Sequence, residues 1–342
     1  MIEIDKMLSN KIANVSFLCS LLIPALHVHV HFDLQTWSHY IHSRIVTGLL
    51  LNAAVPMFFL ISGFLFAGRF DDQSWWRKLL AKRLVSLGVP YVFWNVLFYL
   101  FMAVVVFIGA RYGVTYKGLD LISGSICGMR DVLGLLPIYL PALSLLWFVR
   151  CLIYFVLIAP LFMVFRYKFG GIIIVVSFFG QWLLGSSLSE IDWRKTFWLT
   201  SLVTGFTYFS CGVWLRYHAE LFQGIGQRRL GWVFGILLAL FLGLASKIPE
   251  VFLLPPVLLM IWMLTPSSEW PRWLTRCSFP IYLQHGFWLV FIVAGMKSMR
   301  LANDSWCSFL GQYVVVVFLS IVVTVTARRL LPRFCSIIFG GR

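Results

Sequence analysis

Long apolar stretches separated by short polar segments recur from one end of the chain to the other. A transmembrane helix needs about 20 mostly apolar residues to cross about 30 Å of hydrocarbon. Short segments in which apolar and polar residues alternate, as in a membrane β-barrel, do not occur. We therefore expect an all-α, polytopic transmembrane helical bundle. The predicted spans are 13–31, 45–67, 85–109, 142–165, 171–187, 197–215, 230–246, 251–265, 279–296 and 306–327.

The composition supports a single membrane domain over residues 1–342. Hydrophobic residues make up 60% of the chain and charged residues 12%, against about 25% charged in soluble proteins. The first span lacks a small-residue cleavage site, so we do not expect a signal peptide. The longest polar stretch, 110–141, is expected to cap or line an outer cavity. No internal repeat is visible, which disfavours a transporter built from duplicated halves.

The positive charges predict an orientation. With the N-terminus in the cytoplasm, inner segments hold eighteen Lys and Arg residues and outer segments hold nine; Arg150, inside a span, completes the total of 28. This bias predicts cytoplasmic N- and C-termini. The net charge of +15 then mostly reflects the membrane topology, and the positive side chains can also contact anionic membrane lipids. We expect no nucleic-acid partner.

Three histidines, His27, His29 and His31, lie at the outer end of the first span, just beyond Pro24. An ionisable group at the edge of a transmembrane helix is a functional-site hypothesis by default. An imidazole with an ordinary pKa of about 6.5 can act as a base at neutral pH. A helix that frays into the interface and leaves its histidines solvated is the alternative. His27 is the deepest of the three and the strongest candidate.

Small and basic residues mark the cytoplasmic end of the second span and the segment after it. Ser62 and Gly63 allow a ligand or another helix to approach the backbone closely, and helix packing is the more common reason. The following basic run could bind lipid head groups or the phosphates of coenzyme A, although topology alone also explains it. The run consists of Arg77, Lys78, Lys82 and Arg83.

Further polar residues interrupt the later spans. Arg150, which follows Trp147, is unfavourable inside a membrane unless it faces a cavity or a partner, and we favour a cavity; snorkelling to the interface is the alternative. Tyr282 and His285 are three residues apart and should share one helix face. A structural histidine that hydrogen-bonds a neighbouring helix is the alternative for His285.

The seven cysteines do not have metal-ligand spacing, and we expect no metal and no tightly bound cofactor. Cysteines within spans usually pack as small apolar residues. Cys127 and Cys307 both fall on the predicted outer side, where a disulfide between them is allowed but not implied by the sequence. The cysteines in or near spans are Cys19, Cys151, Cys211 and Cys277.

Four segments, in order, resemble motifs of the acyltransferase 3 family of integral membrane acyltransferases. They are Val55–Phe64 (VPMFFLISGF), Lys82–Leu84 leading to Pro90 and Tyr91, Leu146–Arg150 (LWFVR), and Ser278–His285 (SFPIYLQH). Each motif is weak alone, but together they are fairly specific and span nearly the whole chain.

This resemblance implies transfer of an acyl group, usually acetyl, from acetyl-coenzyme A or another acyl-coenzyme A to a hydroxyl. The acceptor is commonly a sugar of a cell-envelope or exported glycan, and the location a bacterial cytoplasmic (inner) membrane. His27 matches the position of the catalytic histidine, which would serve as the general base. The residues expected to bind substrate or cofactor are Ser62, Gly63, Lys82, Arg83, Trp147, Arg150, Tyr282 and His285.

One departure from the family concerns the first span. The family places an Arg eleven residues before the histidine, where this chain has Ser16. Either another residue, such as Arg150 or His285, takes over its role, or the arrangement differs. Two other functions stay open. One is a transporter or flippase of a lipid-linked or small anionic solute with a histidine proton relay; the other is an inactive relative that serves as a sensor or scaffold.

Overall fold

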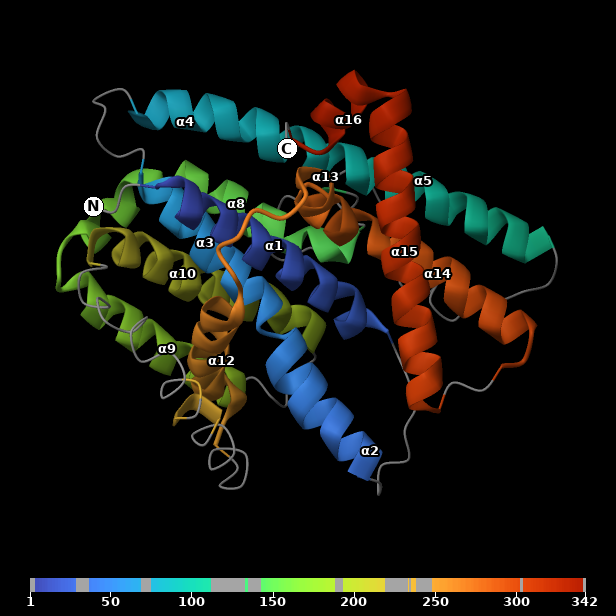
Figure 1. Cartoon of the computed structure of the whole chain (residues 1–342), viewed down its shortest axis with the longest axis horizontal. Coiled ribbons are helices and arrows are strands. Elements are labelled where there is room, and N and C mark those ends of the chain that lie inside the picture. Colours follow the sequence, from blue (N-terminus) through green and yellow to red (C-terminus); the bar gives the residue numbers. More distant parts are fainter. Residues whose placement is uncertain are drawn as a thin grey trace.

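The computed structural model describes residues 4–28, 37–68, 75–111, 133–134, 143–187, 193–218, 233, 235–237, 248–301 and 304–340. Within these ranges the chain forms helices and no strand, as predicted. Figure 1 shows the first helix crossing the middle of the bundle, with the last long helix at one side of it.

The first part of the chain folds into α-helices and two π-helical segments. Both π-helices continue directly into their neighbours, so each belongs to a longer helical run; π-helical turns are rare. The elements are α1 (Lys6–His27), α2 (Trp37–Tyr40), the π-helix η1 (Ile41–Leu51), α3 (Ala54–Ala67), α4 (Trp75–Arg83), the π-helix η2 (Leu84–Gly88) and α5 (Val89–Arg111).

The second part begins with short 3₁₀ and α-helical pieces, and two long helices, α14 and α15, come before a short last helix. The elements are the 3₁₀-helix η3 (Ser144–Leu146), α8 (Trp147–Leu157), the 3₁₀-helix η4 (Ala159–Arg166), α9 (Gly170–Ser187), α10 (Trp193–His218), α12 (Glu250–Leu264), α13 (Arg272–Thr275), α14 (Ser278–Ser298), α15 (Trp306–Leu330) and α16 (Pro332–Ile338).

Six helices of the described ranges are long and apolar enough to cross a membrane, and a bent pair would make a seventh. The helix α12 is apolar but shorter, and most of the predicted span 230–246 lies outside the described residues. The count of ten spans and the location of the termini therefore stay predictions. The six helices are Lys6–His27, Ser38–Ala67, Trp76–Val105, Gly170–Ser187, Ser278–Met296 and Trp306–Leu330.

The predicted single span 142–165 differs from the structure. It consists of Ser144–Leu157 and Ala159–Arg166, which meet at an angle of 78°. Pro160 lies in the first turn of the second piece. Proline has no N–H to donate and its ring clashes with the preceding helical turn, so the helix cannot continue straight through this position.

The helices α3 and α10 are in backbone contact. A Cβ added to Gly63 would lie 2.0 Å from the carbonyl oxygen of Phe209, and one added to Gly212 would lie 2.0 Å from that of Leu60. Such an approach is possible only where side chains are absent. Packing against α10 therefore accounts for Gly63, and Ser62 beside it is partly exposed.

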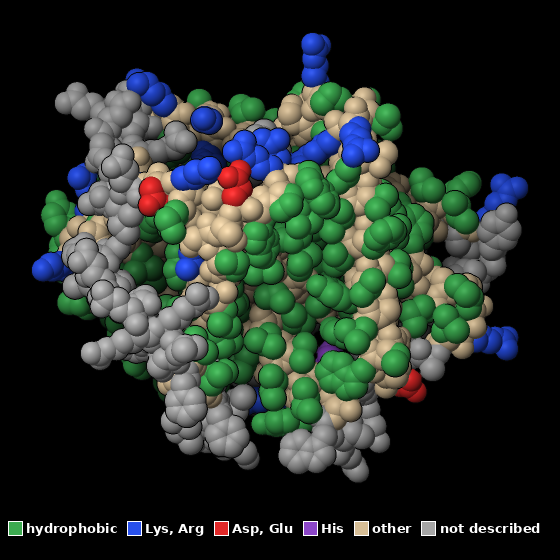
Figure 2. All heavy atoms as spheres, in the orientation of Figure 1, with side chains coloured by type: hydrophobic (Ala, Val, Ile, Leu, Met, Phe, Trp, Pro, Cys, Tyr) green, Lys and Arg blue, Asp and Glu red, His purple; other side chains and the backbone are tan. Residues whose placement is uncertain are grey.

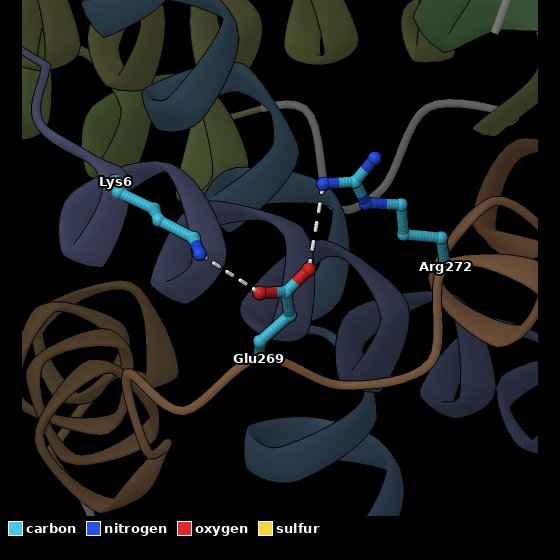
Figure 3. Close-up of polar contacts among 3 residues, drawn as sticks. All are labelled: Lys6, Glu269 and Arg272. Carbon is cyan, nitrogen blue, oxygen red and sulfur yellow. Dashed lines mark ion pairs between the residues drawn. The ribbon is translucent and has the colours of Figure 1, made fainter.

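Hydrogen bonds and ion pairs tie α1 to the segment that leads into α14. The Asn14 amide donates to the carbonyls of Pro266 (3.0 Å) and Ser268 (2.8 Å). The carboxylate of Glu269 lies 3.2 Å from the Lys6 ammonium and 3.4 Å from the Arg272 guanidinium (Figure 3). These contacts fix the N-terminal half of α1 relative to α14.

The outer surface of the bundle carries many large apolar side chains. Examples are Val96 and Leu100 on α5, Val176 on α9 and Phe318 on α15. Figure 2 shows hydrophobic side chains over most of one face and Lys and Arg side chains along its upper margin. An apolar belt with a basic edge is typical of a protein that sits in a membrane.

Candidate functional site

The strongest candidate for a site is the contact between α1 and α14. The ring of His27, the last residue of α1, stacks on the ring of His285 with centroids 5.2 Å apart and planes 26° from parallel. The sequence predicted both residues as intramembrane candidates, and the structure brings them together. Since α1 ends at His27, this ring lies where the helix gives way to the following segment.

His285 is completely buried in the middle of α14. Its Nδ1 lies 3.3 Å from the carbonyl oxygen of Ile281. When Nδ1 carries the proton and donates to that carbonyl, Nε2 is an acceptor. Among the described residues Nε2 has no hydrogen-bond partner. The half-buried His27 and the buried His285 thus form a stacked pair with a buried nitrogen left for a ligand or proton.

Tyr282 connects His285 to the start of α8. The Tyr282 ring centroid lies 6.3 Å from that of His285 and 5.9 Å from that of Phe148. The Tyr282 hydroxyl donates a hydrogen bond to the backbone carbonyl of Leu145. The contact to His285 agrees with the predicted shared helix face. Through Tyr282, α14 holds the segment that enters α8.

Arg150 is buried in α8 at 2% exposure, so it does not snorkel to the interface. Its Nη1 donates to the carbonyl of Gly134 at 2.9 Å. The Tyr91 hydroxyl, from the first turn of α5, donates to the adjacent carbonyl of Leu133. Part of the predicted outer segment 110–141 therefore lies against two core side chains, and Gly134 has a positive φ of 51° that favours glycine.

The remaining candidates lie in other parts of the bundle. Trp147 packs against Phe59 of α3 and Phe197 of α10, with ring centroids 5.9 and 5.6 Å away. Lys82 and Arg83 end α4; Lys82 is exposed and Arg83 partly exposed. The binding roles of these residues, and of Ser62 and Gly63, stay predictions.

Some predicted residues fall outside the described part of the chain. His29 and His31 belong to this group, and so does Cys127 of the proposed disulfide. Cys307 is exposed. Cys19 and Cys277 are buried as predicted for cysteines in spans.

Sequence reasoning missed two buried amides near the site. Asn95 is fully buried; its amide donates to the Tyr91 carbonyl at 2.9 Å and its oxygen accepts from the Leu143 amide at 3.1 Å. Gln284, next to His285, donates to Thr324 of α15 at 3.1 Å. A lone amide inside an apolar stretch was the signal, since such groups must find a partner in a membrane.

The fold and the site together define a class of protein. A helical bundle with an apolar exterior encloses a stacked histidine pair, a buried arginine and buried tyrosines. Ionisable residues placed inside such a bundle mark functional sites. The class is an integral membrane protein with a polar intramembrane centre.

Comparison with known protein families makes this specific. The family model described as an acyltransferase domain matches residues 16–329 of the chain. The chain therefore belongs to the acyltransferase 3 family, as its four motifs suggested, and is a membrane acyltransferase. Searches of curated proteins and of solved structures give no match.

Proposed function

We propose that this protein transfers an acyl group, most simply acetyl, from acyl-coenzyme A to a hydroxyl of a cell-envelope or exported glycan, with His27 as the general base. The family supports acyl transfer in general. The observation that carries the assignment of the base is the stacked pair of His27 and His285, which places an imidazole at the end of a span beside a second, buried imidazole.

The proposed reaction is a direct transfer. A ring nitrogen of His27 accepts the proton of the acceptor hydroxyl while the hydroxyl oxygen attacks the thioester carbonyl carbon. The carbon–sulfur bond then breaks, and the coenzyme A sulfur takes the proton from the imidazolium. The products are an ester and free coenzyme A. General-base assistance of this kind contributes about 10²–10⁴ in rate.

His285 is proposed to position His27 and not to react itself. A stacked ring restricts rotation of the His27 side chain, and Tyr282 in turn packs against the His285 ring. The family's usual Arg is replaced by Ser16, whose carbonyl accepts a hydrogen bond from Ser278 at 2.9 Å. We therefore propose that contact with α14 takes over part of the role that the arginine of the first span has in other members of the family.

The donor and the acceptor are proposed to reach the site from opposite sides. Coenzyme A is anionic and cytoplasmic, and the basic residues at the end of α4 are candidates for its phosphates. The acceptor glycan and a bacterial cytoplasmic membrane location follow from the family resemblance. Membrane lipid surrounds the apolar exterior, and no cofactor is proposed beyond the acyl-coenzyme A donor.

Two measurements test the proposal. Purified protein in lipid nanodiscs is expected to release free thiol from acetyl-coenzyme A only when acceptor glycan is present. Mass spectrometry of surface glycans from cells with and without the gene is expected to show one glycan lighter by one acyl unit in the deletion strain. Solute transport without thioester turnover would support the transporter alternative instead.

A further inference from the structure

We propose that Arg216, near the end of α10, anchors a phosphate-binding site that is separate from the histidine pair. The ligand class is a phosphate ester, supplied either by acyl-coenzyme A or by a lipid head group. The acyl-coenzyme A form rests on the proposed function; the lipid form does not.

The first observation is a buried arginine with two donor nitrogens that have no partner among the described residues. Arg216 is 5% exposed, and its Nε and Nη1 have no hydrogen-bond partner in the part of the chain that the structure describes. The guanidinium lies over the Phe64 ring, 4.9 Å from its centroid. That contact favours the positive charge but uses neither the Nε nor the Nη1 N–H groups. Buried polar groups in native proteins are almost always satisfied, so these donors point to a ligand.

The second observation is the close approach of the guanidinium to the end of α3. Gly68 follows α3, and a Cβ added there would lie 3.2 Å from Nη2 of Arg216. The Tyr217 hydroxyl donates to the Ala67 carbonyl at 3.1 Å, which holds the end of α3 against α10. Any side chain at position 68 would press on the guanidinium, so the glycine allows Arg216 to lie directly against the end of α3.

The charge of the surroundings favours an anion. The guanidinium of Arg166, from η4, lies 5.4 Å from the centroid of the Tyr217 ring. Tyr217 directly follows Arg216 in the sequence, so a second arginine lies against the same end of α10. An arginine offers a planar set of donors that suits the oxygens of phosphate. The charge bias predicts that this end of α10 faces the cytoplasm, where coenzyme A and anionic head groups are both available.

A binding experiment tests the proposal without acyl transfer. Wild-type protein in phosphatidylcholine nanodiscs is titrated with coenzyme A, with pyrophosphate and with pantetheine, which has no phosphate. For Arg216→Gln, affinity for coenzyme A and pyrophosphate is expected to fall at least about tenfold, because a charge-assisted hydrogen bond is lost, while pantetheine binds as before. The matched control is Arg329→Gln, which removes an exposed arginine and should change neither affinity.

A second arm identifies the source of the phosphate. Nanodiscs with phosphatidylglycerol are analysed by native mass spectrometry for lipid that stays bound to the protein. Loss of that lipid in Arg216→Gln with unchanged coenzyme A affinity assigns the site to a head group, and the reverse assigns it to coenzyme A. His27→Ala is expected to keep phosphate binding, so failure of the acyltransferase proposal and failure of this one remain distinguishable.

If Arg216→Gln does not fold, Arg216→Lys and Gly68→Leu replace it. The first keeps the charge without the planar donors, and the second keeps Arg216 but pushes its guanidinium away from the end of α3; each is expected to weaken pyrophosphate binding severalfold. The proposal is overturned if both bind every phosphate compound as wild type does. A double variant, Asp71→Asn with Asp72→Asn, gives a further check. The proposal is also overturned if this double variant and Arg216→Gln lower the melting temperature equally and neither changes phosphate binding. Arg216 would then pair with the chain's own carboxylates.

Discussion

The His27 and His285 rings are stacked 5.2 Å apart, although the two residues come from opposite ends of the chain. Neither helix makes this contact by itself. Ser278 at the start of α14 donates to the Ser16 carbonyl of α1 at 2.9 Å. The alignment of α1 with α14 therefore determines whether the candidate base has a partner, and changes at this interface should affect activity before they affect folding.

The contact between α3 and α10 makes a prediction about stability. Gly63→Ala places a Cβ 2.0 Å from the Phe209 carbonyl oxygen, a distance that the backbone must relieve by moving. Overpacking in a dense core typically costs about 1–3 kcal/mol, and this backbone clash should reach at least that range. Thermal unfolding in detergent should show a lower melting temperature than wild type.

Gly311→Ala is the matched control, because a Cβ at this position of α15 meets nothing within 4 Å. Alanine is the better helix former by about 1 kcal/mol, so its melting temperature should be unchanged or higher. Equal melting temperatures for Gly63→Ala and Gly311→Ala would contradict the close approach of α3 and α10.

The Lys6–Glu269–Arg272 contacts predict a pH dependence. Hydrogen bonding and attraction from Lys6, followed by attraction from Arg272, hold the pKa of Glu269 below its ordinary value of 4.5. A carboxyl with a lowered pKa stabilises the fold fully above its ordinary pKa and loses that contribution as the pH falls through the lowered value. The effect should be small because the groups are exposed.

Melting temperatures of wild type and Glu269→Gln, measured from pH 7 down to pH 3, check this. Wild type should be slightly more stable at neutral pH, and the difference should shrink as the pH falls below the ordinary pKa of the carboxyl. A difference that stays constant over this range would show that the charge of Glu269 is not involved.

The end of α4 makes a prediction about the donor. Lys82→Ala combined with Arg83→Ala should raise the KM for acyl-coenzyme A about tenfold, since phosphate contacts are lost from a partly solvated site. The kcat and the amount of protein in the membrane should stay the same. The control is Arg329→Ala, which removes a basic residue elsewhere on the predicted cytoplasmic side. If the KM is unchanged and the amount of protein in the membrane collapses, Lys82 and Arg83 serve only to determine the topology.

The charge bias predicts which side of the membrane each segment faces. In a background without reactive cysteines, Asp120→Cys should react with an impermeant thiol reagent in intact cells. Arg329→Cys should react only after lysis. The reverse pattern would invert the orientation, because the eighteen-to-nine distribution is its only basis.

The helices themselves were predictable because an apolar run of membrane length has few alternatives. α9, α12, α14 and α15 lie within a few residues of their predicted spans. The bend at Pro160 was missed because hydropathy does not register a missing N–H. Residues 133–134 were expected outside, and only the partners Tyr91 and Arg150, from two other helices, show that they lie against the core.

The candidate site was predictable as a set of residue types but not as a geometry. Spacing placed Tyr282 and His285 on one face, since that depends on a single helix. The pairing of His285 with His27 depends on how α1 packs against α14, which no local pattern encodes. For Gly63 the sequence left helix packing and ligand binding open, and only the position of Phe209 on α10 favoured packing.

The central prediction concerns the base. His27→Ala should lose about 10²–10⁴ in the rate of acyl transfer, the usual contribution of general-base catalysis, while the protein remains folded in the membrane. His29→Ala and His31→Ala should keep most of the activity. α1 ends at His27 and Val28 is extended, so His29 and His31 follow the end of the helix in the sequence, toward the predicted outer side.

His285→Gln separates the two members of the pair. If His285 only positions the base, this variant should lower kcat less than His27→Ala does, and adding His285→Gln to His27→Ala should cause little further loss, because the two residues act as a unit. Thiol release from acetyl-coenzyme A in nanodiscs measures all the variants, with size-exclusion profiles as the folding control. Wild-type activity in His27→Ala together with complete loss in His285→Gln would move the base to His285, whose Nε2 is buried beside the end of α1 without a partner among the described residues.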